Sequence, residues 1–243
     1  MKPQEYSLMY SVEEKHWWFK GKRNLIFSFI DKLNKNNLKI LDAGCGTGII
    51  MQHLQKYGTV YGIDYSNEAI KFCKKRGLKN IKKSSIAKTQ FKANTFDLIT
   101  CLDVLYHKGI KDDVAVLKEF YRILKKDGTL IITDSAMMCL WSKHDIATEA
   151  RERYSKKELT KKLEKANFKV EKISYYNTFL FPIVFLSRKL DNLINKNKEP
   201  KSDIKETNPI LNSILFTILK IEARLINFIN LPFGVSIFCI AKK

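Results

Sequence analysis

The chain lacks long apolar runs. Its densest apolar run, residues 179–186, is far shorter than the roughly 18 apolar residues that a membrane-spanning helix requires. The first fourteen residues also lack an apolar segment followed by a small-residue cleavage site, the pattern of a secretory signal. We therefore expect neither a transmembrane span nor a signal peptide.

Cysteines are few, and their spacing contains no C-x-x-C pair. The odd number argues against a disulfide framework, and the spacing argues against a zinc cluster. We expect buried thiols, no metal site and a reducing, cytoplasmic location. The five residues are Cys45, Cys73, Cys101, Cys139 and Cys239.

Arginine is also scarce, although the net charge is +19: only seven of the 44 cationic residues are arginine. Because arginine is the better bidentate reader of phosphates and bases, this scarcity weakens a nucleic-acid interpretation. The high content of lysine, asparagine and isoleucine is typical of an AT-rich coding sequence, which would explain the net charge without a specific partner. An anionic membrane surface, a lipid-phosphate substrate and a nucleic acid stay open as partners of this charge.

From residue 38 onward, apolar strand patterns alternate with helical ones. The clearest helix spans residues 112–124, and a turn at residues 126–128 precedes the fifth strand. This alternation predicts a parallel sheet with helices on both faces. The strands are expected at residues 38–42, 60–64, 80–83, 96–101 and 130–134.

The flanking segments have different patterns. Residues 5–35 have a helical period, and Ser155 with Glu158 forms a capping box for a helix that ends near residue 166. Strands are expected at residues 168–175 and 233–241. Between them lie two apolar helical segments joined by a polar linker, residues 195–208. We expect one domain, 1–243, with a helical lid at 1–35, a core at 36–177 and 231–243, and a helical insertion at 178–230.

A glycine-rich loop follows the first strand. Asp42 ends the strand, and Gly44, Gly46 and Gly48 follow it with the spacing G-x-G-x-G. Glycines allow a tight turn and a close approach of backbone N–H groups to a ligand. The carboxylate would repel a pyrophosphate, so the loop favours a cationic or hydroxyl-rich ligand over a dinucleotide.

Two further acidic residues end neighbouring strands. Asp64 ends the second strand, where a carboxylate can accept two ribose hydroxyls, and Asp103 ends the fourth strand. Ligand crevices of doubly wound sheets form outside the carboxyl ends of the strands. We therefore expect Asp42, Asp64 and Asp103 to surround one crevice.

In these motifs the chain resembles the small-molecule branch of the class I S-adenosylmethionine-dependent methyltransferases. The resemblance implies a Rossmann-like, doubly wound α/β fold: a mostly parallel seven-stranded sheet with an antiparallel last strand. The later motifs resemble a subgroup associated with bacterial and archaeal surface-glycan or lipid pathways. The segments that carry the resemblance are residues 16–19 near Arg23, the loop at 41–48, Asp64, residues 102–107, 124–128, 140–145, 153–154 and 232–236.

The resemblance implies the positions of the cofactor contacts. Asp42 and the loop, including Gly44, Cys45, Gly46 and Gly48, would hold the methionyl and adenosine side. Asp64 would bind the ribose, and Tyr65 would pack on the adenine. Ser85 and Ile86 align with the residues that flank the adenine, and Leu102 and Asp103 are further expected cofactor contacts. Ser85 stands where many relatives carry an acid, and Thr89-Gln90-Phe91 replaces their Leu-Pro-Phe.

Methyl transfer to a hydroxyl needs a base, and neutral imidazoles suit that work near pH 7. His107 follows the fourth strand, and His144 precedes Asp145, which could orient it. A helix-start role for His107 and a purely structural one for His144 stay open. The resemblance also implies substrate or lid roles for six residues: Trp17, Trp18, Arg23, Trp141, Asp145 and Tyr154. For Trp17 and Trp18 the alternative is an aromatic helix packed on the core.

The insertion is amphipathic, and residues 209–230 keep a helical period of apolar side chains. It fits four roles: a cap on the sheet domain, a groove for a long apolar substrate, a surface that dips into lipid, and a dimerisation face. The chain would accordingly be a monomer or a homodimer, cytoplasmic or peripheral at the inner face of the membrane.

These observations predict an S-adenosylmethionine-dependent methyltransferase acting on a small-molecule, lipid-linked or glycan-linked acceptor at oxygen, with S-adenosylhomocysteine as product. The alternatives are an RNA ribose methyltransferase and a non-catalytic S-adenosylmethionine-binding protein. Base methylation is disfavoured, because the fourth strand is followed by no Asn/Asp-Pro-Pro-aromatic motif and the chain contains no Pro-Cys nucleophile.

Overall fold

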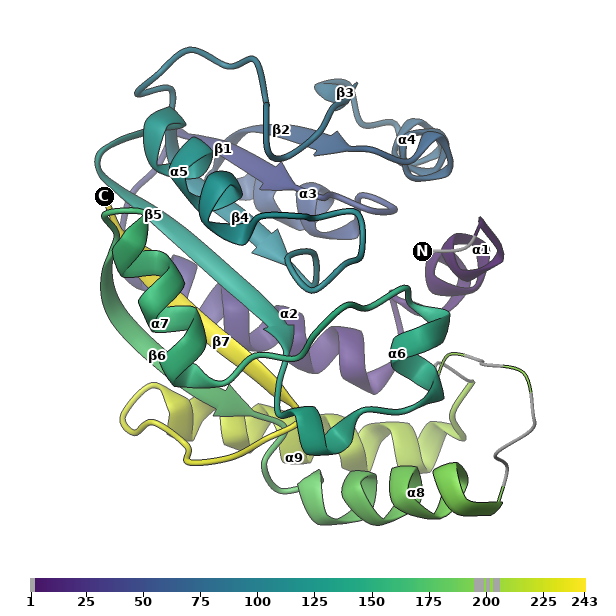
Figure 1. Cartoon of the computed structure of the whole chain (residues 1–243). Helices are drawn as coiled ribbons and strands as arrows, with labels where there is room; N and C mark the ends of the chain where they lie inside the picture. Colours follow the sequence, from purple (N-terminus) through teal and green to yellow (C-terminus); the bar gives the residue numbers. More distant parts are fainter. Residues whose placement is uncertain (1–2, 195–198, 200–201, 203–205) are drawn as a thin grey trace.

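Seven strands form one sheet in the computed structural model, which describes residues 3–194, 199, 202 and 206–243 (Figure 1). The sheet order is β3-β2-β1-β4-β5-β7-β6, and β7 is antiparallel to both of its neighbours. The predicted fold class is confirmed. The strands are β1 (Leu38–Ala43), β2 (Gly58–Asp64), β3 (Ile81–Lys83), β4 (Phe96–Leu102), β5 (Leu124–Ser135), β6 (Lys169–Tyr176) and β7 (Ser236–Lys242).

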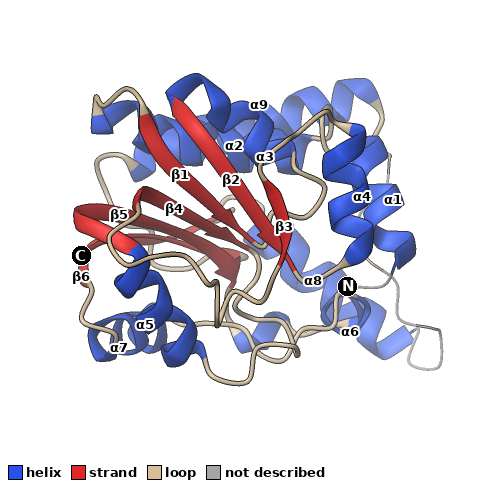
Figure 2. Cartoon of the chain, turned by 90° about the horizontal axis from the view of Figure 1, so that it is seen from above, coloured by secondary structure: helices blue, strands red, loops and turns tan. Residues whose placement is uncertain are grey.

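Helices cover both faces of the sheet (Figure 2). One core contains Ile40 of β1 with side chains of α2 (Trp17–Ile30), α3 (Ile49–Leu54) and α9 (Pro209–Ile226). The adjacent Leu41 belongs to the other core, under α5 (Asp113–Ile123) and α7 (Lys156–Lys165). Neighbouring residues of a strand point to opposite faces, so a continuous apolar run such as β1 is required when both faces are buried.

The capping box read from the sequence is present, and a second cap, which was not predicted, begins α5. Ser155 and Glu158 form the capping box of α7, and the carboxylate of Asp112 accepts the N–H of Ala115 at the start of α5. The remaining described helices are α1 (Pro3–Val12), α4 (Asn67–Lys75), α6 (Lys143–Ala147) and α8 (Phe181–Ile194), with short 3-10 turns η1 (Asp31–Leu33), η2 (Gln55–Tyr57) and η3 (Met138–Leu140).

Two local expectations need correction. The helical pattern of residues 5–35 is not one helix: α1 ends at Val12, and His16 caps α2 by accepting the N–H of Trp18 at 3.3 Å. The turn at residues 126–128 lies inside β5, where the pairing register with β4 shifts between Phe96 and Leu98. The predicted linker, residues 195–208, lies largely outside the described residues. None of the described helices combines the length and apolar content needed to cross a bilayer.

Candidate active site

The glycine-rich loop joins β1 to α3 at the carboxyl edge of the sheet. Gly44 and Gly46 adopt positive φ angles of 81° and 53°. A Cβ on Gly44 would lie 2.4 Å from a methyl group of Val104, whereas one on Gly46 would approach only Met9, at 3.4 Å. Gly44 is therefore required by packing, while Gly46 leaves the cavity side of the loop open.

Asp64 fixes this loop from the end of β2. Its Oδ2 accepts the N–H of Gly46 at 3.0 Å, and its Oδ1 accepts the N–H of Ser66 at 2.8 Å. Burial raises the pKa of Asp64, and the two N–H donors oppose that shift. One carboxylate thus sets the position of both the loop and the start of α4.

Asp42 is almost fully buried at the end of β1. Its Oδ1 accepts the hydroxyl of Thr100 at 2.7 Å. Burial raises the pKa of Asp42 to about 7, and the nearby Asp64 adds to that shift. A cationic ligand beside Asp42 would favour its ionised form.

A cavity of about 700 Å³ lies against these groups. This volume falls within the range of about 300–1,000 Å³ typical of small-molecule sites. The structure places most of the predicted site residues on its wall: Trp17, Trp18, Arg23, Asp42, Gly44, Cys45, Gly46, Asp64, Tyr65, Ser85, Ile86, Leu102, Asp103, His107 and His144.

Asp103 forms an ion pair with Lys22 of α2 and accepts the hydroxyl of Thr133 at 3.1 Å. The Lys22 side chain is only 9% exposed, so this pair is shielded from solvent. Sequence reasoning missed Lys22. Its spacing could have indicated a site role, because Lys22 follows Trp18 by four residues and so lies on the same helix face.

The N-terminal helix closes the cavity over the loop through Glu13. This buried carboxylate accepts the hydroxyl of Thr47 at 2.5 Å and pairs with Arg76 at 2.5 Å. Arg23 donates to the backbone oxygens of Glu13 and Glu14, at 2.6 and 2.9 Å. Arg23 therefore anchors the turn between α1 and α2, a role that no local pattern in the sequence indicates.

The aromatic residues of α2 hold this lid against the rest of the fold. Trp18 stacks on Tyr176 of β6, with ring centroids 5.5 Å apart. The backbone N–H of Trp17 donates to the side chain of Asn212 in α9 at 2.7 Å. Tyr65, expected to pack on a ligand, lies at the cavity with 77% of its surface exposed.

The two histidines lie on the cavity wall, at the β4–α5 connection and in α6. The Nδ1 of His107 accepts the N–H of Gly109 at 3.1 Å, and its Nε2 lies 3.3 Å from Glu149. Burial lowers the pKa of His107, so the ring is neutral at pH 7. His144 is half-buried on the first turn of α6.

The far end of the cavity wall, on the side of β6 and β7, was not predicted. Asn177, Arg188 and Ser236 line it, from the end of β6, from α8 and from the start of β7. Asn177 is 3% exposed, and its Oδ1 has no hydrogen-bond partner within the described residues. A buried acceptor without a partner is costly, so this atom fits a donor on a ligand.

Four predicted site residues are not on the cavity wall. Asp145 binds the guanidinium of Arg153 through two bonds of 2.8 and 3.1 Å, and Arg153 in turn lines the cavity. Gly48 caps α3, and the backbone oxygen of Trp141 accepts a bond from Asn192. Their effect on the cavity is therefore indirect.

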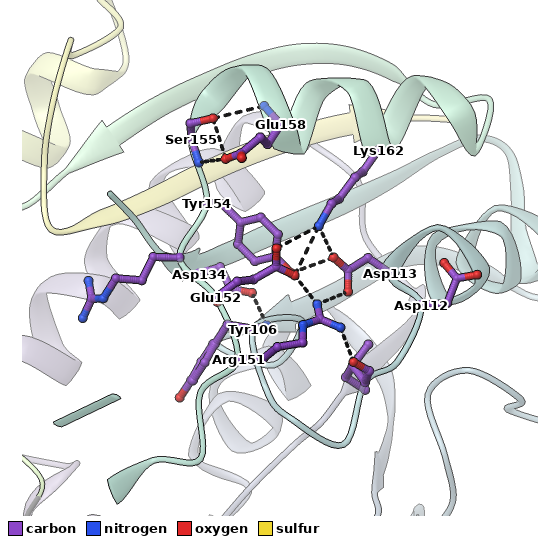
Figure 3. Close-up of polar contacts among 12 residues, drawn as sticks. Tyr106, Asp112, Asp113, Asp134, Arg151, Glu152, Tyr154, Ser155, Glu158 and Lys162 are labelled. Carbon is purple, nitrogen blue, oxygen red and sulfur yellow. Dashed lines mark hydrogen bonds and ion pairs between the residues drawn. The ribbon is translucent and has the colours of Figure 1, made fainter. Parts of the chain in front are cut away.

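Tyr154 is fully buried in a cluster of polar contacts (Figure 3). Its hydroxyl donates to Asp113 at 2.9 Å, and Asp113 also pairs with Arg151 and Lys162. These contacts join α5 and α7 to the segment after α6. Tyr154 therefore joins these segments and does not lie on the cavity wall, although the resemblance implied a substrate or lid role for it.

The donor set fits S-adenosylmethionine. Three strand-end carboxyl groups, Asp42, Asp64 and Asp103, converge on the cavity beside a loop with one open side at Gly46. Carboxylates suit a ligand that carries a sulfonium, an ammonium and two ribose hydroxyls. The polar groups of the far end remain for a second ligand.

Comparison with known proteins agrees with this assignment. Residues 41–132 match the family described as a methyltransferase domain. The chain is 28% identical to a ubiquinone biosynthesis O-methyltransferase from Haemophilus ducreyi over 39% of its own length and 44% of that protein. It is 37% identical to phosphoethanolamine N-methyltransferase 1 from Zea mays over 44% of its own length and 22% of that protein. The chain thus spans less than half the length of these curated relatives.

Among solved structures, a methyltransferase described as SAM-dependent from Archaeoglobus fulgidus shares the fold. The two structures superpose with a TM-score of 0.58 at 20% identity, covering 91% of this chain and 94% of that one. At this identity, the likeness supports the architecture alone.

Proposed function

Because the chain belongs to the class I S-adenosylmethionine-dependent methyltransferase family, we propose that it transfers a methyl group to the oxygen of a small-molecule acceptor. The observation that carries this proposal is one cavity whose wall extends along the sheet edge from the side of β1 and β2 to the side of β6 and β7. One end has the glycine loop and three carboxyl groups, and the other has Asn177, Arg188 and Ser236.

At the first end, Asp42, Asp64 and the loop around Gly46 would hold the cofactor, with Asp103 and its partner Lys22 beside it. When bound, S-adenosylmethionine supplies a methyl group already activated by the sulfonium. The protein must then align the acceptor and exclude water. Helix α1, held by Glu13 on Thr47 and Arg76, covers this end and serves the second purpose.

The second end would hold the acceptor. The unpartnered Oδ1 of Asn177 selects an acceptor with a hydrogen-bond donor, such as a hydroxyl. The curated relatives named above include an O- and an N-methyltransferase, so the acceptor atom must be argued from this site. The imidazoles of His107 and His144 on the wall favour oxygen, since a hydroxyl must lose its proton during attack.

We assign removal of that proton to His107 or His144. In its neutral form His107 donates from Nε2 toward Glu149 and accepts at Nδ1 from Gly109, so it acts as a base only when the Gly109 contact opens. His144 lies on the same cavity wall, in α6, and is tested beside His107. The acceptor class that we infer is a small molecule, either free or attached to a lipid or glycan.

Calorimetry with S-adenosylmethionine and S-adenosylhomocysteine tests the first step. We expect binding of both ligands, and a loss of about tenfold or more in the variant Asp64→Ala, which removes a charged hydrogen-bond acceptor. Binding of neither ligand would overturn the proposal. Transfer of labelled methyl groups to lipid extracts, soluble metabolites or RNA then identifies the acceptor, and label found only in RNA would contradict the small-molecule assignment.

A further inference from the structure

Helix α8 presents an apolar stripe to solvent. The stripe follows spacings of three and four residues, which place its members on one helix face. Its members are Ile183, Leu186, Leu190 and Leu193, with exposed fractions of 67%, 60%, 54% and 76%. An exposed apolar face of this length is unusual on a water-facing helix.

Two polar side chains of α8, those of Arg188 and Asn192, bind the backbone of the neighbouring segment at residues 140 and 141. Arg188 donates to the backbone oxygen of Leu140, and Asn192 donates to that of Trp141, both at 3.0 Å. Arg188 is buried, while its neighbour Leu190 is exposed. The polarity of α8 is therefore the reverse of that expected for a helix packed on a core in water.

Helix α9 has two apolar faces, of which one is covered. Leu219, Ala223 and Ile226 are buried, on the side that packs on α2. The second face continues as a stripe along the helix and beyond its end. Its members are Ile210, Ile214, Ile221, Leu225 and Phe228, and Phe228 is 85% exposed. Both α8 and α9 lie along the lower edge of the molecule in Figure 1.

Charge indicates what covers these stripes. The exposed charged side chains of the two helices are Lys189, Lys220 and Arg224. Of their acids, Asp191 is half-buried, and Glu222 is buried and accepts backbone N–H groups of residues 178 and 179. A second copy of the chain would bring another net charge of +19 against the first. An anionic bilayer is complementary to both the apolar stripes and the cations around them.

We propose that the outward faces of α8 and α9 dock on an anionic lipid bilayer, with their stripes in the interfacial region. The inner face of α8 contributes Val184 and Arg188 to the cavity wall, so the docked surface adjoins the acceptor end. If the proposed function holds, docking would give the cavity an acceptor drawn from the membrane; the docking itself does not depend on methyl transfer.

Flotation of the full chain with lipid vesicles tests the docking, with no cofactor present. We expect binding to phosphatidylcholine vesicles that contain phosphatidylglycerol and at least tenfold weaker binding to phosphatidylcholine alone. The variant Ile183→Ser/Leu190→Ser should lose at least tenfold in binding to the anionic vesicles. The matched control Ile146→Ser removes an apolar side chain that is 45% exposed on α6 and should bind as the parent does.

Charge-reversal variants test the electrostatic contribution to vesicle binding. Lys189→Glu/Lys220→Glu should weaken binding strongly, whereas Lys118→Glu on the exposed side of α5 should not. Equal binding by the parent and the Ile183→Ser/Leu190→Ser variant would overturn the proposal. So would a concentration-dependent dimer in sedimentation that this variant abolishes, since the stripes would then belong to a second copy. Calorimetry with S-adenosylmethionine measures cofactor binding on its own, so a failure of the proposed function is distinguished from a failure of membrane docking.

Discussion

Asp42 is the residue whose chemistry depends most directly on its surroundings. Buried at the end of β1, it accepts one hydroxyl bond from Thr100 and has a pKa of about 7. At neutral pH the ligand-free site is therefore a mixture of protonated and ionised forms. A cationic ligand binds the ionised form, so binding below this pKa must release a proton.

We predict that S-adenosylmethionine binds more tightly at pH 8 than at pH 6. Affinity should rise with pH through about 7, where half of the Asp42 carboxyl groups are ionised, and level off at about pH 8, where ionisation is nearly complete. Calorimetry in buffers of different ionisation enthalpy measures both the affinity and the protons released. In Asp42→Asn the affinity should be lower and nearly independent of pH. A parent affinity that falls between pH 6 and pH 8 would contradict the assignment.

The histidines give a second prediction at this scale. Replacing the base by glutamine should lower kcat by about 100- to 10,000-fold while leaving cofactor affinity unchanged. Because burial lowers the pKa of His107, a rate that depends on its neutral form should rise only below pH 6.5 and be flat above. Parallel kcat measurements on His107→Gln and His144→Gln, at saturating cofactor, distinguish the two. Unchanged rates in both variants would remove the imidazoles from the mechanism.

At the scale of elements, the contact between α2 and α9 is set by one glycine. A Cβ on Gly21 would lie 2.4 Å from Cδ1 and 2.8 Å from Cβ of Leu219, which is 3% exposed. Gly21 thus lets the two helices approach each other closely. The same contact connects the lid side of the cavity to the helix that carries the second apolar stripe.

We predict that Gly21→Ala destabilises the fold by about 1–3 kcal/mol, measured as the free energy of unfolding in urea. Alanine gains up to about 1 kcal/mol in helix propensity over glycine, but the clash with the immobile Leu219 outweighs it. In the Leu219→Ala background the same substitution should be neutral or stabilising. A destabilisation of equal size in both backgrounds would rule out the clash as the cause.

An element or site residue could be predicted from the sequence when its interactions are local, and could not when they join residues far apart in the chain. The strands of the sheet and the cap of α7 follow local patterns, so they were found, as were Asp42, Asp64 and Asp103 at strand ends. Glu13 and Asn177 were missed because their roles come from contacts across the fold. Tyr154 was assigned to substrate for the opposite reason: its motif is local, but its partners in α5 and α7 are not.

At the scale of the whole molecule, the cavity joins distant parts of the chain. Its wall takes residues from α1 and α2, from the strand ends of the core and from α8. A ligand in it therefore contacts segments that separate on unfolding. Binding should stabilise the whole fold cooperatively, as mass action requires for a ligand that binds only the native state.

We predict that S-adenosylmethionine at 100 times its Kd stabilises the fold by about 2.7 kcal/mol. For a chain of this size, that free energy corresponds to a rise in Tm of roughly 5–10 °C. Differential scanning calorimetry measures the rise, and Asp64→Ala at the same ligand concentration serves as the control with weakened binding. A Tm that does not respond to ligand, in a chain shown to bind it, would mean that the cavity walls unfold independently.

The position of β7 sets the order in which this fold can be completed. It lies between β5 and β6, although it follows both of them and the two helices of the insertion along the chain. Until Ser236–Lys242 insert, β6 has no strand that joins it to the sheet, and Ser236 cannot reach the cavity. Completion of the cavity wall at β6 and β7 therefore depends on long-range contacts. Such contacts slow folding and leave strand edges unpaired until the last strand inserts.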